Sequence, residues 1–407
     1  MIENFPRLLV ATEFPPNGSG GGAAIVRQML QGWPPEKLHW WSLYPDADAH
    51  FGQQVQSHDT IQIPRRLIPF VRLHRLKSSV LERFWVPWAS RHLRQTILKI
   101  RPEAIWAIPS GWAIRPLAAV IPETKTSVHV SIHDYPDDLR AVRVMGEKRC
   151  REVARLVDVC YAKATTRDAI SQSMVEDLQA RTGRDGEVSH AGLRPSDLKF
   201  LEHRIEKHSS SIRIAFVGSI SAEETFIAFV NAITSIQPQL TRPVTLEIFS
   251  AHSYATRPWF DPSWMHERGN LADPEFTVAL RECDWGFAPM SLRDDDPRHR
   301  FSLSTKFVSY LSAGLPIITM GHPETGVVQI ARQYNVGPCI TSENPVRLRQ
   351  IILDAVCLPN PWEIHRSEII RCAHEEFSSD VLRGRLYRNF EICAQKTSSL
   401  QNGMKLA

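Results

Sequence analysis

Short runs of apolar residues alternate with longer amphipathic segments along most of this chain. Four runs in the first half have the length of buried strands and are separated by helix-like segments: 7–12 (RLLVAT), 38–43 (LHWWSL), 104–108 (AIWAI) and 127–132 (SVHVSI). The run at 157–162 (VDVCYA) predicts a further strand, and a helix is expected over 168–183. A repeated strand and helix order of this kind predicts a parallel β-sheet covered by helices.

The same pattern starts again near residue 212. Its strand candidates are 212–218 (IRIAFVG), 244–250 (VTLEIFS), 283–289 (CDWGFAP) and 315–320 (LPIITM), with a helix over 222–236. A charged and then serine-rich stretch at 199–211 separates the two series, which is typical of an exposed connection between domains. The length of 407 residues also suits two cores better than one. We therefore predict two α/β domains, at 1–200 and 211–375, and a flexible polar tail at 396–407.

Composition narrows the classes of function only slightly. The net charge is +4 and the isoelectric point is about 8.7, a weak excess that does not indicate a dedicated nucleic-acid-binding protein. The seven cysteines include no C-x-x-C pair, which argues against a disulfide framework or a zinc site and favours a reducing cytoplasm. The N-terminus lacks the pattern of a secretory signal, and no stretch approaches the roughly 20 apolar residues that cross a bilayer. We predict a cytoplasmic protein.

Basic residues dominate the stretch at 65–101. Glu82 is its only acidic residue, and Phe70, Trp85 and Trp88 are interleaved with the arginines and lysines. One interpretation is a solvated helical face whose tryptophans pack inward. The other is a peripheral contact with anionic lipid at the inner face of the cell membrane, or with an acidic acceptor.

A glycine-rich loop joins the first predicted strand to the first helix. Four glycines fall within five residues, Gly18 and 20–22, and such a loop offers backbone N–H groups where an anion or a sugar hydroxyl can bind. No G-K-[ST] follows, so the loop is not a P-loop. Gly18, Gly20 and Ala23 fit the dinucleotide fingerprint G-x-G-x-x-A, which makes an NAD-dependent oxidoreductase one alternative. Asp46, however, comes late after the second strand for the ribose contact that such an enzyme needs.

His133 and Asp134 come directly after the predicted strand at 127–132. Open parallel sheets bind ligands at the carboxyl ends of their strands, so His133 and the adjacent Asp134 are candidate functional residues. A loop histidine bonded to its neighbour is the simpler alternative. His129, inside the same strand, is expected to pack in the core.

Lys306 lies in the first turn of a predicted helix, with Ser304 as N-cap and Gly314 and Pro316 at its end. The helix dipole is positive at that end, so a cation there is locally unfavourable unless an anion such as a phosphate binds beside it. A lysine that reaches solvent is the alternative. The preceding loop supplies further phosphate candidates at Arg293, Arg298 and Arg300. Its D-x-D sequence at 294–296 fits a solvated acidic loop better than a metal site.

Several motifs together resemble the retaining glycosyltransferases of family 4, the group 1 glycosyltransferases, which have the GT-B fold of two Rossmann-like domains. These motifs are LLVATEFPPNGSGGGAA from residue 8, HAGLRPSDL at 190–198, IAFVGS at 214–219, CDWGFAPM at 283–290 and SLSTKFVSYLSAGLPIIT at 302–319. The resemblance implies that the first domain binds the acceptor and the second a nucleotide sugar, with the chemistry in a cleft between them. It also implies that a final helix at 376–395 returns to the first domain.

The resemblance assigns roles to individual residues. His133 would lie beside the transferring sugar, Lys306 would neutralise the donor diphosphate, and both would be catalytic. Asp134 would contact the acceptor. Gly21 and Gly22 would line the cleft near the donor phosphates. The other implied donor-binding residues are Gly218, Ser219, Asn270, Leu271, Ser304, Thr305 and Ser309. No metal ligand and no cofactor are implied, because the nucleotide sugar is a co-substrate and lysine or arginine can stabilise the leaving diphosphate.

Two positions depart from the family pattern. Members commonly carry two glutamates eight positions apart, of which the second binds the ribose, and here those positions are Phe301 and Ser309. The loop GSISAEET also lacks the basic residues of many relatives. We predict a hexosyltransferase that transfers a sugar to a glycan or lipid-linked acceptor in cell-surface polysaccharide biosynthesis. The alternative is a non-catalytic GT-B-like protein that binds a glycan or a partner. The sequence leaves the base, the sugar, the linkage and the oligomeric state open.

Overall fold

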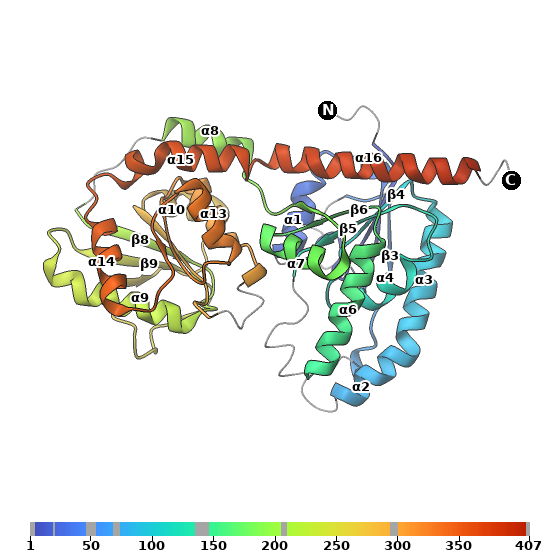
Figure 1. Cartoon of the computed structure of the whole chain (residues 1–407), viewed down its shortest axis with the longest axis horizontal. Helices are drawn as coiled ribbons and strands as arrows, with labels where there is room; N and C mark the ends of the chain where they lie inside the picture. The colour runs from blue at the N-terminus through green and yellow to red at the C-terminus, as the bar shows by residue number, and fades with distance from the viewer. Residues whose placement is uncertain are drawn as a thin grey trace. The chain divides into compact units, whose positions relative to one another are not determined.

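The computed structural model describes residues 5–18, 21–45, 54–67, 74–134, 146–204, 210–293 and 300–403. The chain forms two compact units (Figure 1). Unit 1 is Met1–Ala191 with Val381–Ala407, and unit 2 is Gly192–Asp380. Among the described helices, none is both long and apolar enough to span a membrane.

The described residues of unit 1 form a seven-stranded parallel sheet in the order β3-β2-β1-β4-β5-β6-β7. The strands are β1 (Leu8–Ala11), β2 (Leu38–Ser42), β3 (Ser57–Thr60), β4 (Ala104–Ala107), β5 (Val128–Ile132), β6 (Thr166–Ala169) and β7 (Glu187–Val188). The α-helices are α1 (Gly21–Met29), α2 (His74–Val80), α3 (Val86–Ile100), α4 (Ile114–Val120), α6 (Glu147–Lys163) and α7 (Gln172–Thr182). Shorter helical turns are η1 (Pro35–Lys37), η2 (Arg65–Leu67), the π-helical η3 (Leu81–Trp85) and η4 (Gly111–Ala113).

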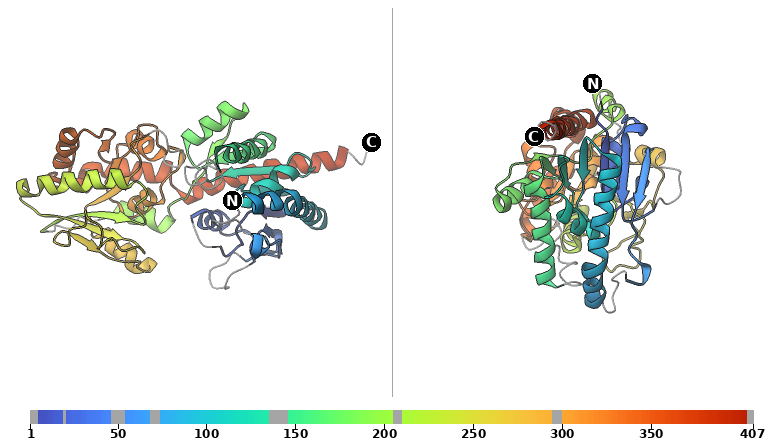
Figure 2. Two further views of the ribbon diagram at one scale, coloured as in Figure 1. Left: turned by 90° about the horizontal axis from the view of Figure 1, so that it is seen from below. Right: turned by 90° about the vertical axis from the view of Figure 1, so that its right-hand side faces the viewer.

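Helices cover the sheet of unit 1, so its central strands are buried. Every residue of β1, β4 and β5 is buried, as expected for parallel strands with both faces covered. Helices α3, α4 and α6 lie side by side over the sheet, where α3 contacts β2 and α6 contacts β5 (Figure 2). The apolar runs that predicted strands at 7–12, 38–43, 104–108 and 127–132 coincide with β1, β2, β4 and β5.

Helix α16 (Ser379–Gly403) packs on unit 1 over much of its length. The Phe390 ring lies 5.4 Å from that of Trp106 in β4 and 5.6 Å from that of His129 in β5. Near its end, the buried Thr397 hydroxyl accepts a hydrogen bond of 2.8 Å from the Ser127 N–H. The helix therefore continues through 396–403, where the polar composition predicted a flexible tail.

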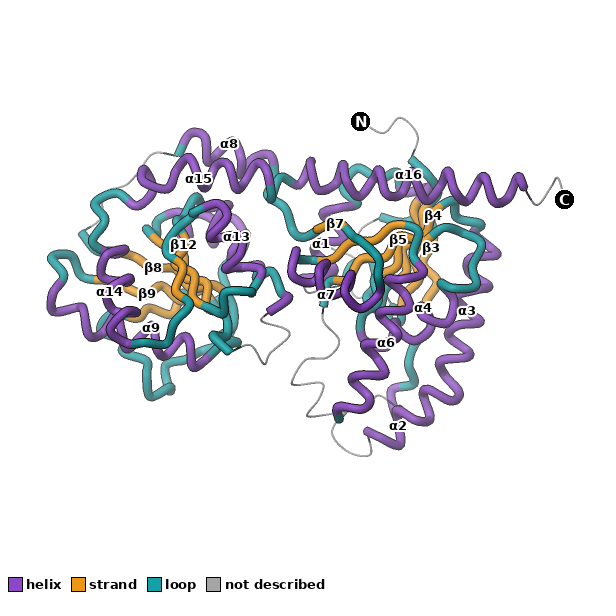
Figure 3. The backbone as a smooth tube through the Cα atoms, viewed as in Figure 1, coloured by secondary structure: helices purple, strands orange, loops and turns teal. Residues whose placement is uncertain are grey.

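Unit 2 repeats the architecture with a six-stranded parallel sheet among its described residues, in the order β10-β9-β8-β11-β12-β13. The strands are β8 (Ile212–Val217), β9 (Val244–Phe249), β10 (Met265–Glu267), β11 (Trp285–Pro289), β12 (Ile317–Met320) and β13 (Cys339–Ile340). The helices are α8 (Pro195–His203), α9 (Glu223–Ile236), η5 (Gln237–Gln239), α10 (Asp273–Arg281), α12 (Thr305–Ala313), α13 (Gly326–Tyr334), α14 (Pro345–Val356) and α15 (Pro361–Glu375). Figure 3 shows the strands of each unit enclosed by helices. The strand order is that of a Rossmann fold, which confirms the α/β prediction.

Two local expectations were wrong, and the boundary between the units also differs from the predicted one. The run 157–162 is not a strand but part of α6, because its buried residues continue a helical spacing through Cys150, Val153, Val157 and Cys160. Helix α7 begins only after its N-cap Ser171, and 166–169 form β6. Unit 2 already begins at Gly192, since α8 packs against α12 and α15. Residues 205–209 of the expected connection lie outside the described residues.

Tyr310 of α12 fixes that helix against the sheet of unit 2. Strands β8 and β11 pair only at Ile214–Trp285 and Ala215–Gly286. Beyond that point the Tyr310 hydroxyl accepts from the Val217 N–H at 3.0 Å and donates to the Phe287 carbonyl at 2.8 Å. The tyrosine thus replaces the backbone hydrogen bonds that the diverging strands no longer make.

We predict that Gly286→Ala destabilises unit 2, because a Cβ at this position would lie 2.3 Å from the Tyr310 ring. The ring is held by two hydrogen bonds and cannot move freely, so overpacking should cost at least about 1–3 kcal/mol. Gly384→Ala in α16 is the control: a Cβ there meets nothing nearer than 3.9 Å, and alanine should stabilise the helix by roughly 0.5–1 kcal/mol. Urea unfolding of both variants measures the contrast, and an unchanged Gly286→Ala midpoint would contradict it.

Candidate functional site

A pocket of about 360 Å³ lies at the carboxyl ends of β8, β9 and β10 in unit 2. Gly218, Ser219, Asn270 and Leu271 all line it, although the first pair and the second pair are far apart along the chain. Gly218 has a φ of +80°, a conformation that favours glycine and lets the backbone turn closely at the end of β8. The structure thus brings four of the predicted donor-binding residues to one place, at the edge where parallel α/β sheets bind ligands.

Lys306 lies next to this pocket. A Cβ added to Gly218 would be 3.5 Å from the Lys306 Nζ, and that nitrogen lies 5.5 Å from the centroid of the Phe216 ring. Within the described residues no carboxylate pairs with this ammonium group. Burial lowers the pKa of Lys306, which shows that the charged form is poorly solvated here. An anion bound at this place would supply the missing counter-charge.

The first turn of α12 offers further donors to the same anion. Ser304 is the N-cap, as predicted, but its side chain makes no capping hydrogen bond, which leaves N–H groups of the first turn without that partner. Thr305 is exposed. The Ser309 hydroxyl donates to the Thr305 carbonyl at 3.2 Å, so it is engaged with its own helix. Phe301 is buried and has no polar group with which to bind a ribose.

The arginines of the preceding loop are placed less favourably than the sequence suggested. Arg300 forms an ion pair of 2.7 Å with Glu324. Arg293 is exposed, and Arg298 lies outside the described residues together with the acidic run at 294–296. Among these candidate cations, Lys306 is the one that the structure places beside the pocket.

In unit 1, His133 follows β5 and lies beside the glycine-rich loop. Its side chain is only 7% exposed, and a Cβ at Gly22 would lie 3.6 Å from its Nδ1. This Nδ1 is buried and has no hydrogen-bond partner among the described residues. Burial lowers the pKa of His133, so the ring is neutral at neutral pH. A buried ring nitrogen without a partner, facing glycine, can bind a ligand hydroxyl.

The residues around His133 differ in exposure, and their exposure limits what each of them can contact. Gly21 and Gly22 begin α1, while Gly20 lies outside the described residues. Asp134 is exposed and can reach a ligand from the edge of the sheet. His129 is fully buried and bonds to Asp168 at 2.9 Å, which confirms that it packs in the core.

The sequence reasoning missed Glu13, which follows β1 at the same edge. Its Oε1 accepts a hydrogen bond of 3.0 Å from the Trp112 N–H. A Cβ at Gly111 would lie 2.0 Å from its carboxylate, so only glycine fits there, at a φ of +47°. Burial raises the pKa of Glu13. The rule that pointed to His133, a polar residue just after a buried strand, would have found Glu13 as well.

No cluster of three or more histidine, cysteine, aspartate or glutamate side chains that could hold a metal ion occurs in the described part of the chain.

Comparisons with known proteins identify the fold. No protein-family model and no curated protein matches the sequence. Solved structures do match along almost the whole chain. One is a UDP-forming α,α-trehalose-phosphate synthase from Burkholderia xenovorans in complex with glucose-6-phosphate, with 12% identity, 95% of this chain and 100% of that chain covered, and a TM-score of 0.65.

Two further structures are similar to a comparable degree. HepE from Anabaena in complex with UDP has 13% identity, with 95% and 99% of the two chains covered and a TM-score of 0.63. WaaG, a glycosyltransferase involved in lipopolysaccharide biosynthesis, has 11% identity, coverages of 93% and 98%, and a TM-score of 0.59. These similarities confirm the predicted GT-B fold of two Rossmann-like domains.

We predict that His133 makes the stability of unit 1 depend on pH below its ordinary pKa of 6.5. The folded protein keeps the ring neutral, whereas the unfolded chain takes up a proton as the pH falls below 6.5. The free energy of unfolding should therefore decrease between about pH 6.5 and pH 5, and His133→Gln should reduce that slope. Thermal melts across this range measure it. Equal slopes in both proteins would show that the ring titrates alike in the folded and unfolded states.

Proposed function

We propose that this protein is a glycosyltransferase that transfers a sugar from a nucleoside diphosphate donor to a glycan or lipid-linked acceptor. The observation that carries the proposal is the half-buried Lys306 ammonium, with which no carboxylate of the described residues pairs, beside Gly218 and the pocket of unit 2. Such a site suits a diphosphate. The GT-B fold adds support, since similar structures include enzymes described as UDP-forming and a protein bound to UDP.

The donor would lie across the pocket of unit 2. Its base would contact the backbone at Asn270 and Leu271, and its diphosphate would meet Gly218, Ser219 and the first turn of α12. As the bond between the sugar and the diphosphate breaks, negative charge develops on the leaving group, and Lys306 stabilises it. The proposal assigns this role to Lys306 and the helix N–H groups rather than to a metal ion or a cofactor.

The edge of unit 1 would bind the reacting sugar and the acceptor. The neutral His133 ring can hydrogen-bond a sugar hydroxyl through Nδ1, while Gly21 and Gly22 leave space for the sugar beside it. Asp134 and Glu13 are carboxyl groups that can accept from the acceptor hydroxyl. We further propose that transfer retains the anomeric configuration, that the sugar is a hexose, and that the product belongs to cell-surface polysaccharide biosynthesis.

A second candidate function follows from the two positions at which family 4 enzymes commonly carry glutamates, one of which binds the ribose. Phe301 is buried and Ser309 bonds to its own helix, so neither offers the carboxylate that family 4 enzymes commonly place there. A GT-B-like protein that binds a glycan or a partner without catalysis would need no such contact. The NAD-dependent alternative depends on Gly20 and Asp46, which lie outside the described residues.

The basic segment supports a peripheral contact with an anionic membrane at its cytoplasmic face. Four large apolar side chains of the described part of this segment are exposed: Leu76 at 61%, Phe84 at 67%, Trp88 at 52% and Leu98 at 73%. Arg75, Arg83 and Arg91 are exposed on the same helices. Glu82 pairs with Arg115 and Arg149 instead, and Trp85 packs inward. Apolar side chains flanked by arginines suit an anionic lipid surface. Phe70 and Arg72 lie outside the described residues.

We predict that one nucleoside diphosphate raises the melting temperature of the protein and that Lys306→Ala weakens its binding at least about tenfold, because hydrogen bonds to charged groups contribute roughly 1.5–3 kcal/mol. The panel consists of UDP, GDP, ADP, TDP, CMP, NAD and the corresponding nucleotide sugars. Lys199→Ala, an exposed lysine in α8 of the same unit, is the matched control and should bind normally.

The outcomes of this panel separate the alternatives. Turnover of the stabilising nucleotide sugar, slowed by His133→Ala without loss of donor binding, would establish the transferase. A response to NAD alone would favour the oxidoreductase, and no response to any nucleotide would favour the non-catalytic protein. Normal binding and turnover in both Lys306→Ala and His133→Ala would refute the assigned site.

We predict that the protein sediments with phosphatidylserine vesicles and that Arg75→Ala combined with Arg83→Ala weakens this binding more than about tenfold, since each basic residue near an anionic surface contributes roughly 1 kcal/mol. Phe84→Ser should weaken it as well. Val346→Ser is the control, because it removes an apolar side chain that is 67% exposed but belongs to unit 2. Equal sedimentation of all four proteins would favour a solvated helical face.

A further inference from the structure

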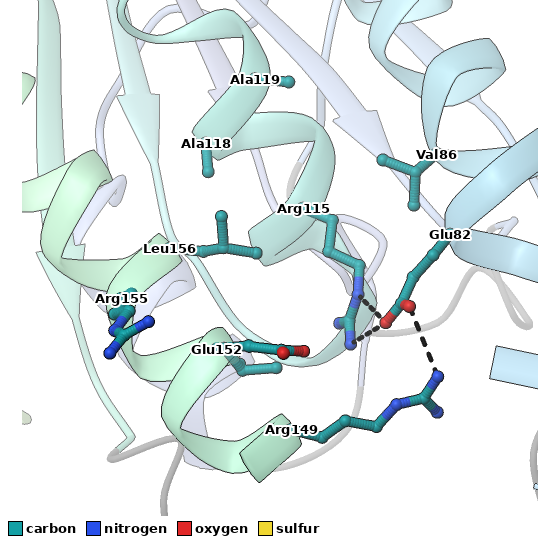
Figure 4. A pocket seen from close by; sticks show the side chains of 10 residues that line it. Glu82, Val86, Arg115, Ala118, Ala119, Arg149, Glu152, Arg155 and Leu156 are labelled. Atoms are coloured by element: carbon teal, nitrogen blue, oxygen red, sulfur yellow. Dashed lines mark hydrogen bonds and ion pairs between the residues drawn. The ribbon is translucent and has the colours of Figure 1, made fainter. Parts of the chain in front are cut away.

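A second cavity, of about 490 Å³, lies in unit 1. Its walls come from α4, α6 and the η3–α3 segment, so it lies among the helices that cover the sheet (Figure 4). Arg115 enters it from the first turn of α4 and Arg149 from the first turn of α6. The N-terminus of α6 carries partial positive charge, so it contributes charge of the same sign as the two arginines.

The arginines are held by a carboxylate that they share. Arg115 is only 8% exposed, and its Nη2 lies 3.2 Å from the Glu82 Oε1. The Arg149 Nη2 donates to the Ser79 hydroxyl at 2.9 Å and lies 3.5 Å from the Glu82 Oε2. Figure 4 shows both guanidinium groups directed toward Glu82. One carboxylate thus faces two guanidinium groups, and the wider lining, with Arg155 and Glu152, has one positive charge in excess.

One guanidinium nitrogen of Arg149, a residue that lines the cavity, has no partner in the described part of the chain. The Arg149 Nη1 is buried and has no hydrogen-bond partner among the described residues. A buried polar group of this kind is costly unless it finds a partner, and a charged donor more so than a neutral one. The geometry therefore leaves a donor for a further acceptor beside a cavity large enough to admit one.

The cavity also has an apolar part. Val86, Ala118, Ala119, Val153 and Leu156 line it, and Figure 4 shows the small side chains of Ala118 and Ala119 facing this space beside Leu156. Ligand pockets typically combine such an apolar lining with a few placed polar groups. A ligand with an anionic head and an apolar flank matches both parts of the lining.

We propose that this cavity binds the phosphate group of the acceptor, through Arg149 and Arg115, with any apolar chain of that acceptor against the alanine and leucine wall. The identification of the ligand as the acceptor rests on the proposed transferase function, but the binding of a phosphate group does not. Arginine is well suited to the role because its planar donors match phosphate oxygens in pairs. The phosphate can belong to a lipid-linked acceptor or to a soluble sugar phosphate.

Trp112 links this cavity to the edge that carries Glu13. Its ring stacks under the Arg115 guanidinium at 4.0 Å, and its backbone N–H donates to Glu13. Trp112 therefore contacts both Arg115, which would hold the phosphate, and Glu13, whose carboxyl group can accept from an acceptor hydroxyl. Glu82 in turn competes with the phosphate for the same two arginines, so its charge tunes the affinity.

The test measures binding by calorimetry on the full chain, without donor and without turnover. The probes are farnesyl phosphate below its micelle concentration, farnesol as the uncharged equivalent, and inorganic phosphate. We expect farnesyl phosphate to bind, Arg149→Gln to weaken it at least about tenfold as expected for a lost charged hydrogen bond, and Glu82→Gln to tighten it. Arg151→Gln is the matched control on α6, since Arg151 pairs with Glu147 outside the cavity at 3.3 Å.

Each outcome decides a separate point. Binding of farnesyl phosphate that depends on Arg149, with weak inorganic phosphate, supports a lipid-linked acceptor, whereas equal and Arg149-dependent binding of inorganic phosphate supports a soluble one. Farnesol that binds as well as farnesyl phosphate would overturn the proposal. Normal binding of farnesyl phosphate by the Arg149→Gln variant, together with an unchanged affinity of the Glu82→Gln variant, would also overturn the proposal. Circular dichroism confirms that each variant is folded, and nucleotide binding by unit 2 is measured separately, so failure here leaves the transferase test intact.

Discussion

The contact of Tyr310 with Gly286 is the constraint on which the candidate donor site depends. Strands β8 and β11 diverge beyond their two paired positions, and the tyrosine hydroxyl bonds to both of them. Lys306 lies one helical turn before Tyr310 on the same face, since residues four apart are neighbours. The close packing of the ring over a glycine therefore holds the ammonium beside Gly218. The divergence lies at the point where the strand order reverses, where such folds bind their ligands.

The two units present different chemistry at the carboxyl edges of their sheets. Unit 2 offers a cation whose charge no described carboxylate balances, next to a turn with a positive φ. Unit 1 offers a neutral imidazole with a buried nitrogen that has no partner among the described residues, and a carboxyl group whose pKa is raised by burial. The first arrangement suits a leaving diphosphate, and the second suits sugar hydroxyl groups. Each lies at the carboxyl ends of strands, where parallel sheets bind their ligands.

Glu82 explains two features of unit 1 that look unrelated in the sequence. It is the only acidic residue of the basic segment, and the structure directs it toward Arg115 and Arg149. The outer side of the same helices is therefore left with arginines and the exposed Phe84 and Trp88. The inner side becomes a cavity in which one carboxylate is shared by two guanidinium groups. Because Glu82 points inward, the outer surface of these helices keeps its positive charge, and the cavity still has one positive charge in excess.

The sequence by itself determined the α/β class, the order of most strands and helices, the GT-B resemblance, and the candidate positions of His133 and Lys306, because apolar periodicity and residues after strand ends are local signals. It misread 157–162 as a strand, since a short apolar run does not distinguish a strand from a buried helix segment. Only the tertiary structure decided the pairs that are distant in the chain. Glu13 and Trp112 are 99 positions apart and Glu82 and Arg115 are 33 apart, and strand order and helix packing, not local pattern, bring them together.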